Sequence, residues 1–411
     1  MSYDVLIVGG GASGLAAAAR LAGHPVRVLL LERNPRVGKK LLSTGNGRCN
    51  LSNEQMSASL YGHGAVFVRE LYQVIPPEKV LAFFHSLGLM TLSEEGRIYP
   101  RTMTAASVLD TLRQAIDAPN ITLVTDTEIT ALGRESDGTW VARSREGKRF
   151  HARYALLAAG GSAAPKSGSD GSGAALLAAL SLPLTPASPA LVQVRTRPAL
   201  PALKGLRTRA EVTLLVDGTP DLQETGELLF TDYGISGVCV FQLSGTAATA
   251  LRSGHTVQVR INLLPELTPN MVPDWLDSRL RDRGDGSLGT CFTGVFQRIL
   301  TETILKAAGL RPDQPANVSG EEKSRLCSAL TAFPLTVTGT LGFEHAQVTR
   351  GGLSLASVNP RTLEVLPGLY VAGELLDVDG PCGGYNLHFA FACGLAAADA
   401  MASASQNGDP T

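Results

Sequence analysis

A glycine-rich turn near the N-terminus is the strongest structural signal in this sequence. The apolar run Val5–Val8 has the length and branched side chains of a strand buried on both faces, and Gly9, Gly11 and Gly14 then match the G-x-G-x-x-G pattern. In that pattern the first glycine makes the tight turn, the second leaves room for a pyrophosphate, and the third lets the following helix pack close to the strand. The free N–H groups and the dipole of that helix stabilise the negative charge.

The residues that follow supply the context that makes the pattern specific. Val26–Leu31 is typical of a second buried strand, and Glu32 comes next, at about the spacing of 20 positions where a carboxylate accepts a ribose hydroxyl. A second match, Gly284–Gly289, follows a charged segment and no strand, so we interpret it as a loop. The sequence therefore predicts one dinucleotide site, built on the first turn.

The length and the charge of the chain limit the number of domains and the kinds of partner. A chain of 411 residues is expected to form two or three domains. The formal net charge is −1 and no run of five like charges occurs, so neither a nucleic acid nor an anionic membrane is indicated as a partner. We expect a small-molecule substrate, and no feature indicates the oligomeric state.

The cysteines and the apolar segments bear on the cellular compartment. The six cysteines are scattered, with no C-x-x-C motif and no metal-ligand spacing to a histidine, which predicts reduced thiols and no metal site. The first strand begins at residue 3, which leaves no room for a targeting peptide, and no apolar stretch reaches the ~18 residues of a membrane span. These features predict a cytoplasmic protein without a membrane segment.

Beyond Glu32 the sequence predicts further α/β structure around a long polar loop. Gly38–Asn53 is too polar and too rich in glycine for a core element, and we interpret it as a functional loop, with a solvated connection as the alternative. Tyr154–Ala158 reads as another buried strand, and it ends near Gly160 at a second place where the sheet meets a ligand. Helices are predicted at 65–88 (two), 104–118 and 172–182, and strands of a small antiparallel meander at 121–124, 128–132, 140–145 and 149–151.

The α/β pattern of predicted strands and helices stops after residue 189 and returns near the C-terminus. Short strands from Leu191 to about Leu264, with one helix over 238–252, predict a β-rich domain. The next segment, 268–330, is predicted to be mostly helical, including 292–308, and strand-like character returns at 334–348. A short strand at Leu369–Ala372 then stops at Gly373–Glu374, and an Ala-rich helix begins at Asn386. We therefore expect three parts: a discontinuous Rossmann-like domain (1–188 and 349–411), a β-rich inserted domain (189–265 and 333–348) and a helical insert (266–332).

Four motifs together resemble a known family nearly end to end. They are the Gly9–Gly14 turn, Gly38–Lys40 with Thr44–Asn50, Phe230–Ser236, and Tyr370–Gly380 with Gly383–Leu387. In these motifs the chain is similar to the BaiN-like, aminoacetone-oxidase-like bacterial flavoproteins. The resemblance implies FAD in a two-part cofactor domain, an inserted β-barrel-like domain and a small helical insert. One departure is Cys382, where Thr or another small polar residue is expected.

The resemblance also implies which residues meet the cofactor. The pyrophosphate would be held by Gly9, Gly11, Ser13 and Gly14, the adenosine ribose by Glu32 with Arg33 beside it, and Ile129 would lie near the adenine. Lys40, Asn46, Gly47, Arg48 and Cys49 would approach the flavin half, and Gly373, Glu374, Asp379, Asn386 and Leu387 would meet the ribityl chain and the isoalloxazine ring.

No residue is indicated as the catalytic acid or base. The substrate-side candidates are Arg48, Asp232, Tyr233 and His388; Asp232 and Tyr233 lie on a glycine-bounded turn and either face the substrate or only shape that turn. For His388 we favour a core or flavin-adjacent histidine over a catalytic base. For Cys49 we favour a packed thiol over a redox-active one, because no resolving cysteine lies near it in sequence.

These observations predict an FAD-dependent oxidoreductase, with the direction of electron flow left open. Only one glycine pattern has the strand and helix context, so NAD(P)H would act as a transient donor at the open face of the flavin. The resemblance favours an NAD(P)H-dependent reductase of a small unsaturated or carbonyl substrate. An oxidase of a small amine such as aminoacetone and a non-catalytic redox sensor are the alternatives, and an RNA-modifying flavoprotein is disfavoured by the near-zero net charge.

Overall fold

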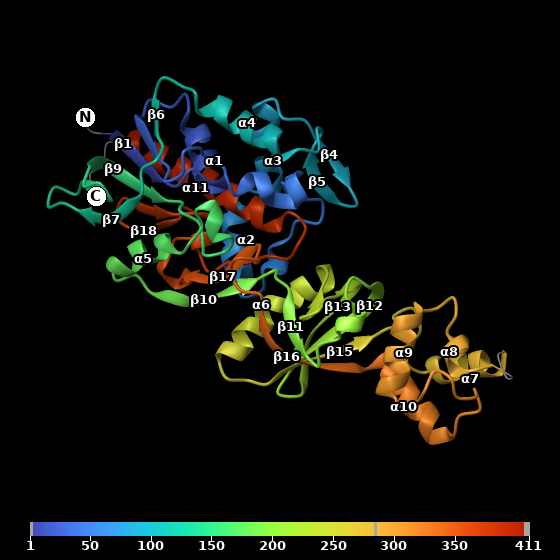
Figure 1. Ribbon diagram of the computed structural model, residues 1–411. Coiled ribbons are helices and arrows are strands. Elements are labelled where there is room, and N and C mark those ends of the chain that lie inside the picture. The colour runs from blue at the N-terminus through green and yellow to red at the C-terminus, as the bar shows by residue number, and fades with distance from the viewer. Residues whose placement is uncertain (1–2, 283–285, 407–411) are drawn as a thin grey trace. The chain divides into compact units, whose positions relative to one another are not determined.

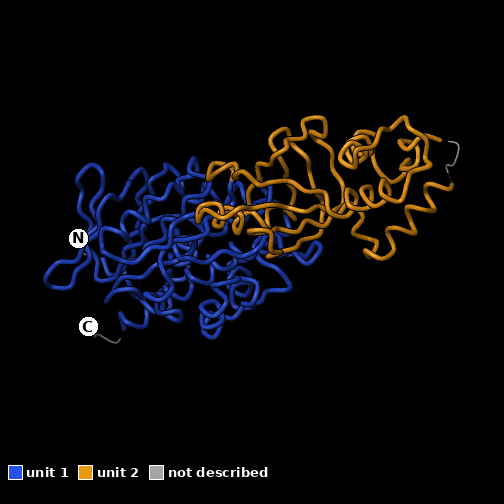
Figure 2. The backbone as a smooth tube through the Cα atoms, turned by 90° about the horizontal axis from the view of Figure 1, so that it is seen from below, with its two compact units in different colours: residues 1–189, 346–411 blue, residues 190–345 orange. Residues whose placement is uncertain are grey.

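The chain folds into two compact units. The computed structural model describes residues 3–282 and 286–406, so that part of the second glycine pattern, at Gly284, lies outside the described residues. The first unit consists of residues 1–189 and 346–411, and the second consists of residues 190–345 (Figure 2). The division into three parts with a separate helical insert remains a prediction.

The first unit is built on a mostly parallel sheet with the strand order β18-β19-β9-β1-β2-β6 (Figure 1). β1 pairs in parallel with β2 and β9, β19 pairs in parallel with β9, and β6 pairs in parallel with β2. Their short apolar runs are typical of strands covered on both faces. The strands span Tyr3–Val8 (β1), Val28–Leu31 (β2), Ile121–Val124 (β6), Arg149–Leu157 (β9), Glu364–Leu366 (β18) and Leu369–Val371 (β19).

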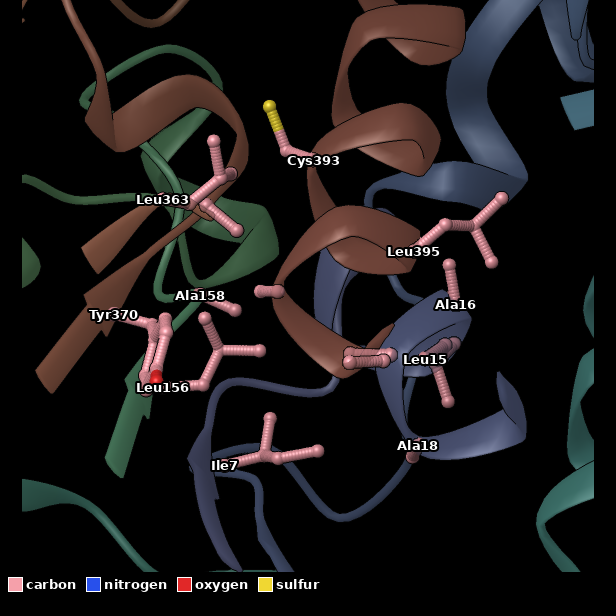
Figure 3. Close-up of a cluster of buried hydrophobic side chains, with 14 of the residues drawn as sticks. Ile7, Leu15, Ala16, Ala18, Leu156, Ala158, Leu363, Tyr370, Cys393 and Leu395 are labelled. Atoms are coloured by element: carbon pink, nitrogen blue, oxygen red, sulfur yellow. The ribbon is translucent and has the colours of Figure 1, made fainter. Parts of the chain in front are cut away.

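Two helices from opposite ends of the chain pack against each other beside this sheet. α1 (Ala12–Leu21) follows β1, and α11 (Tyr385–Gln406) follows the last parallel strand. A Cβ at Gly394 of α11 would collide with the carbonyl oxygen of Ser13, so glycine is required for this close packing. Figure 3 shows the resulting core, with Ile7 and Leu156 on the strands and Leu395 on α11. The return of the C-terminal segment to β1 and α1 therefore makes the Rossmann-type domain discontinuous.

The apolar character of α11 is explained by its place in the core. By length and composition this helix could cross a membrane, so the expectation that no apolar stretch has the length of a membrane span was wrong for α11. However, 67% of its most apolar window is buried inside the protein. A core helix covered on most sides has the same composition as a membrane span.

Two strand assignments differ from the sequence prediction. Ile121–Val124 was expected in the antiparallel meander, but it is the edge strand β6 of the parallel sheet. The predicted strands at 149–151 and 154–158 form one strand, β9, which ends at Leu157. The start of β9 pairs antiparallel with β8, and its later part pairs parallel with β1 and β19. Strand partners are set by contacts between distant segments, which the local pattern does not encode.

The remaining elements of the first unit surround the sheet. β7 and β8 form the meander with β9, β3-β5-β4 form a three-stranded sheet, and β10 pairs with β17. Their bounds are β3 Ser52–Asn53, α2 Ala65–Val74, α3 Pro77–Ser86, β4 Thr91–Glu94, β5 Arg97–Pro100, α4 Ala105–Ile116, β7 Ile129–Arg134, β8 Trp140–Ser144, α5 Ser172–Ala179, β10 Leu184–Ala190 and β17 Val348–Leu353. The polar segment 38–53 contains the kinked 3-10 helix η1 (Leu41–Gly47), whose residues Thr44, Gly45 and Asn46 have non-helical backbone angles, and a second 3-10 helix, η2 (Ala58–Gly64), follows the segment.

The second unit contains a closed barrel with the strand order β11-β14-β13-β12-β15-β16. α6 (Val238–Arg252) packs against the barrel strands, and the later helices share one hydrophobic cluster with the barrel interior. The segment 292–297 was expected to be helical, but it is a turn between α8 and α9. The bounds are β11 Val194–Arg197, β12 Arg207–Val216, β13 Thr219–Phe230, β14 Gly234–Ser236, β15 Val257–Asn262, α7 Val272–Asp282, α8 Leu288–Cys291, α9 Arg298–Ala307, α10 Gly320–Thr331 and β16 Phe333–Thr340.

Candidate functional site

Four parallel strands of the first unit end in residues that the sequence singled out. Gly9 directly follows β1 and Glu32 directly follows β2, whereas Gly160 and Gly373 lie in the short loops just after β9 and β19. Because the strands are parallel, all four ends lie along one edge of the sheet, which we call the carboxyl edge. Ligands of open α/β sheets bind at this edge.

The glycine-rich turn has the shape that a pyrophosphate requires. Gly9 has a φ of +108°, and a Cβ at Gly14 would collide with the Gly9 carbonyl oxygen, so both positions need glycine. A Cβ at Gly11, in contrast, would meet no described atom within 4 Å. Gly11 is also the N-cap of α1, and none of the described side chains caps that end of the helix. Open space in front of an uncapped helix N-terminus fits a phosphate group.

Glu32 is held rigidly at the end of β2. The side chain is 7% exposed, and Oε2 accepts a hydrogen bond from the Gly10 N–H at 2.9 Å. Oε1 accepts from the backbone N–H and from the side-chain amide of Asn34, each at 2.7 Å. A carboxylate has about four acceptor sites, so these three bonds leave capacity for a ribose hydroxyl.

Arg33 lies at the same end of the sheet and connects three segments. Its Nη1 atom is 2.7 Å from Asp170 and 3.3 Å from the Ser172 hydroxyl, and its Nη2 atom is 3.4 Å from Glu128. Ile129, expected near the adenine, is buried in β7 next to Glu128. The guanidinium therefore joins the end of β2 to the loop before α5 and to the start of β7.

The start of η1 and the end of β19 meet through an ion pair. Lys40 Nζ lies 2.6 Å from Glu374 Oε2, and the two side chains are 24% and 20% exposed. The other carboxylate oxygen of Glu374 accepts from the backbone N–H of Thr349 at 3.0 Å and from its hydroxyl at 2.8 Å. Beside them, a Cβ at Gly373 would lie 2.7 Å from the Ser13 hydroxyl oxygen. Residues predicted for the two halves of the cofactor are thus brought to one edge.

The central part of the 38–53 segment places its polar residues in different surroundings. Asn46 and Gly47 are exposed and have positive φ angles. Arg48 is turned toward the three-stranded sheet, where it lies 3.3 Å from Glu94 and 4.9 Å from the ring centre of Tyr99. Cys49 is fully buried, and burial raises the pKa of its thiol to about 12. A thiol with this pKa is protonated at neutral pH, which supports a packed thiol rather than a redox-active one.

His388 occupies a buried position on α11. It is 0% exposed, its Nδ1 atom lies 2.8 Å from the Ser52 hydroxyl oxygen, and its Nε2 atom has no hydrogen-bond partner among the described residues. Burial lowers the pKa of the imidazole to about 3. The side chain is therefore neutral near pH 7 and shielded from solvent, which favours the core role over the role of a catalytic base.

The turn after Glu374 is held by further contacts. Asp379 forms a bidentate ion pair with Arg350, with a shortest distance of 2.9 Å. Asp377 accepts a hydrogen bond from the Gly351 N–H at 3.0 Å and lies 3.0 Å from His63 Nε2. Asn386 accepts from the Gly380 N–H and donates to its carbonyl oxygen, each at 2.8 Å, and Leu387 lies half-buried next to it.

The two remaining candidates lie in the second unit. Asp232 and Tyr233 occupy the turn between β13 and β14, where Asp232 pairs with Lys204 at 2.6 Å and the Arg195 guanidinium lies 5.9 Å from the Tyr233 ring centre. Gly160, in the first unit, has a φ of +75°, and a Cβ there would lie 2.6 Å from the Ser169 hydroxyl oxygen. The role of these residues toward substrate or cofactor remains a prediction.

Several residues at the carboxyl edge were not found from the sequence. Thr349 and Arg350 of β17 contact Glu374 and Asp379, His63 contacts Asp377, and Asp170 contacts Arg33. The presence of three acidic residues within Glu374–Asp379 was a usable signal that cationic partners exist. Their identity depends on which distant segments fold against that turn.

Comparisons with known proteins identify the family of this chain. The sequence matches the family described as HI0933-like protein Rossmann domain over residues 3–400. It is 40% identical over 406 residues to the 3-dehydro-bile acid delta(4,6)-reductase of Clostridium scindens, covering 96% of this chain and 98% of that protein. It is 26% identical over 416 residues to the ribosomal RNA dihydrouridine synthase of Escherichia coli, covering 98% and 99% of the two chains.

A solved structure supports the fold. The 3-ketosteroid delta1-dehydrogenase of Sterolibacterium denitrificans superposes with a TM-score of 0.53 at 14% identity, covering 98% of this chain and 100% of that one. Because the family match extends over nearly the whole sequence and the relative at 40% identity is a reductase, this chain belongs to the HI0933-like family and is an FAD-dependent oxidoreductase.

Proposed function

We propose that the protein is an NAD(P)H-dependent reductase of carbon–carbon double bonds that are conjugated to a carbonyl group. The observation that carries this proposal is the 40% identity, over almost the full length of both chains, to a delta(4,6)-reductase of 3-dehydro bile acids. The name of the ribosomal RNA relative also denotes the saturation of a double bond next to a carbonyl, here in uracil. The two relatives share this chemistry although their substrates differ in size and charge.

The residues of the carboxyl edge would hold the cofactor for this chemistry. When bound, FAD supplies a flavin ring that accepts a hydride from one substrate and gives it to another. The turn at Gly11 would bind the pyrophosphate through the N-terminus of α1, and Glu32 would accept a ribose hydroxyl. The paired side chains of Lys40 and Glu374 would offer a cation and a carboxylate to the flavin half, as the resemblance implies for these two residues. These groups bind and orient, and the hydride chemistry is that of the cofactor.

The donor and the acceptor would use the flavin in turn. The sequence contains one glycine pattern with the strand and helix context, so NAD(P)H has no dedicated dinucleotide domain of that kind. NAD(P)H would reduce the flavin and leave before the unsaturated substrate binds. This order gives ping-pong kinetics.

A two-stage anaerobic experiment tests the proposal. The oxidised protein is first mixed with NADH or NADPH, and the loss of flavin absorbance is followed by stopped flow. A steroid with a 3-oxo-4,6-diene is then added, and we expect the flavin colour to return as the double bond is saturated. The matched control is the same steroid without the two double bonds, which should leave the flavin reduced.

Three other outcomes would replace the proposal by another function. Bleaching by aminoacetone but by neither nicotinamide, with peroxide release in air, would identify an amine oxidase. Reoxidation by ribosomal RNA but by no steroid would identify an RNA reductase, a result that the net charge of −1 does not favour. Failure of every donor to reduce the flavin at a useful rate would support a redox sensor.

A further inference from the structure

Three consecutive residues of β17 contact three acidic residues of the turn that follows β19. Thr349 contacts Glu374, Arg350 contacts Asp379, and Gly351 donates to Asp377. The turn also continues alongside β17, since the Asp377 N–H donates to the Leu353 carbonyl oxygen at 3.1 Å. These contacts with β17 therefore fix the conformation of this turn.

The hydroxyl of Thr349 uses all of its hydrogen-bonding capacity within the site. It donates to Glu374 Oε1 at 2.8 Å and accepts from the N–H groups of Ser162 and Ala163 at 2.7 and 3.0 Å. One donated and two accepted bonds are the maximum for a hydroxyl group. The side chain is 2% exposed, so water does not compete for these bonds. One buried oxygen thus connects the residues after β9 to the carboxylate after β19.

The position of the Thr349 hydroxyl oxygen explains why residue 161 is a glycine. A Cβ at Gly161 would lie 2.5 Å from Thr349 Oγ1 and 2.8 Å from Glu374 Oε1, so no side chain fits beside the hydroxyl and the carboxylate. The loop after β9 therefore approaches the turn after β19 by its backbone alone.

We propose that Thr349 is a positioning residue for the cofactor. It holds Oε1 of Glu374 on the β17 side, so that Oε2 is directed toward Lys40 and the residues expected around the flavin half, and it fixes the loop after β9 through the same hydroxyl. The inference rests on the FAD cofactor and not on the proposed substrate. Titration with FAD tests it without any donor or acceptor.

The test is a series of variants of the full-length protein, stripped of cofactor and titrated with FAD. Thr349→Val keeps the shape of the side chain and removes the hydroxyl, so we expect the Kd for FAD to rise on the order of tenfold to a hundredfold. Thr349→Ser restores the hydroxyl and should stay within about threefold of the wild type. Thr249→Val is the matched control, because the hydroxyl oxygen of Thr249 is buried without a partner among the described residues.

A double-mutant cycle separates orientation of Glu374 from general damage to the fold. In a Glu374→Ala background Thr349 has no carboxylate to orient, so Thr349→Val should then change the Kd by a clearly smaller factor. An unchanged factor in that background, or a wild-type Kd for Thr349→Val, overturns the proposal. If Thr349→Val does not fold, Gly161→Ala provides the second test, because its methyl group displaces the hydroxyl and the carboxylate without removing either. Wild-type FAD affinity in Gly161→Ala would also overturn it.

Discussion

The ammonium group of Lys40 lies 2.6 Å from the carboxylate of Glu374, although 334 positions separate the two residues in the sequence. Lys40 is the N-cap of η1, and Glu374 follows β19, the last parallel strand. Both side chains are mostly shielded from solvent. The pair therefore links the N-terminal and C-terminal parts of the cofactor domain at the carboxyl edge.

This pair should show energetic coupling in the protein without cofactor. Removing one partner leaves a partly buried charge, so we expect Lys40→Met and Glu374→Gln each to lower the free energy of unfolding by about 1–2 kcal/mol. The double variant should lose about 1 kcal/mol less than the sum of the single variants. Urea unfolding measures all three. The exposed neighbour Lys39 provides the control, since the free energy of unfolding of Lys39→Met should stay within about 0.5 kcal/mol of the wild type. If the losses of the two single variants simply add up in the double variant, the pair is not coupled.

Gly11 and Gly14 should respond differently to alanine. A methyl group at Gly11 meets no described atom within 4 Å, so Gly11→Ala should fold with wild-type stability, yet bind FAD at least about tenfold more weakly because the methyl occupies the space in front of α1. Calorimetry with FAD, together with unfolding of the apoprotein, measures both effects. Unchanged affinity in Gly11→Ala would show that the pyrophosphate lies elsewhere.

Gly14→Ala, in contrast, should damage the fold itself. Its methyl group would collide with the Gly9 carbonyl oxygen and would push α1 away from β1. We expect a loss of about 2–4 kcal/mol in the free energy of unfolding of the apoprotein. Gly133→Ala is the matched control, because no described atom lies within 4 Å of the added Cβ there. Equal stability of the two variants would rule out the tight helix–strand packing at Gly14.

His388 should destabilise the protein as the pH falls. The pKa of the buried imidazole is about 3, below the value of about 6.5 in an unfolded chain. Below about pH 6.5 the imidazole is therefore protonated in the unfolded state but stays neutral in the folded state. The free energy of unfolding should therefore fall by up to about 1.4 kcal/mol per pH unit toward pH 3. His388→Gln should flatten this slope, whereas replacement of the exposed His85 should not. Identical slopes for the wild type and His388→Gln would show that the imidazole is not buried in the neutral form.

His63 should act in the opposite direction. Its hydrogen bond to Asp377 raises the pKa of the imidazole despite partial burial. The stabilisation is therefore fully present below about pH 6.5 and is lost as the pH rises through the raised pKa. Because His63 is half-exposed, the effect should be less than about 1 kcal/mol. The difference in the free energy of unfolding between the wild type and His63→Gln, measured from about pH 6 to about pH 9, checks it, and a difference that grows in favour of the wild type as the pH rises would contradict the sign.

The cofactor turn could be read from the sequence because its determinants are local. A buried apolar run followed by Gly9, Gly11 and Gly14 specifies a strand, a turn and a closely packed helix, and each requirement concerns neighbours along the chain. The same holds for Glu32, which follows its own strand directly. The parallel Rossmann-type sheet and the β-rich character of the second unit were predictable for this reason, because apolar runs and alternating patterns report the burial of each strand separately. The barrel itself was implied only by the family resemblance.

The partners of these elements came from contacts that span hundreds of residues. No local pattern indicated that β9 joins the meander to the parallel sheet, that Thr349 contacts both Glu374 and Ala163, or that Lys40 reaches the same carboxylate. Likewise, His388 and Cys49 have ordinary sequence neighbours, and their shifted pKa values result from burial by distant segments. Residue type and spacing fix the conformation of a short segment, whereas the choice among many possible hydrogen-bond and ion-pair partners depends on which segments the packed core brings together.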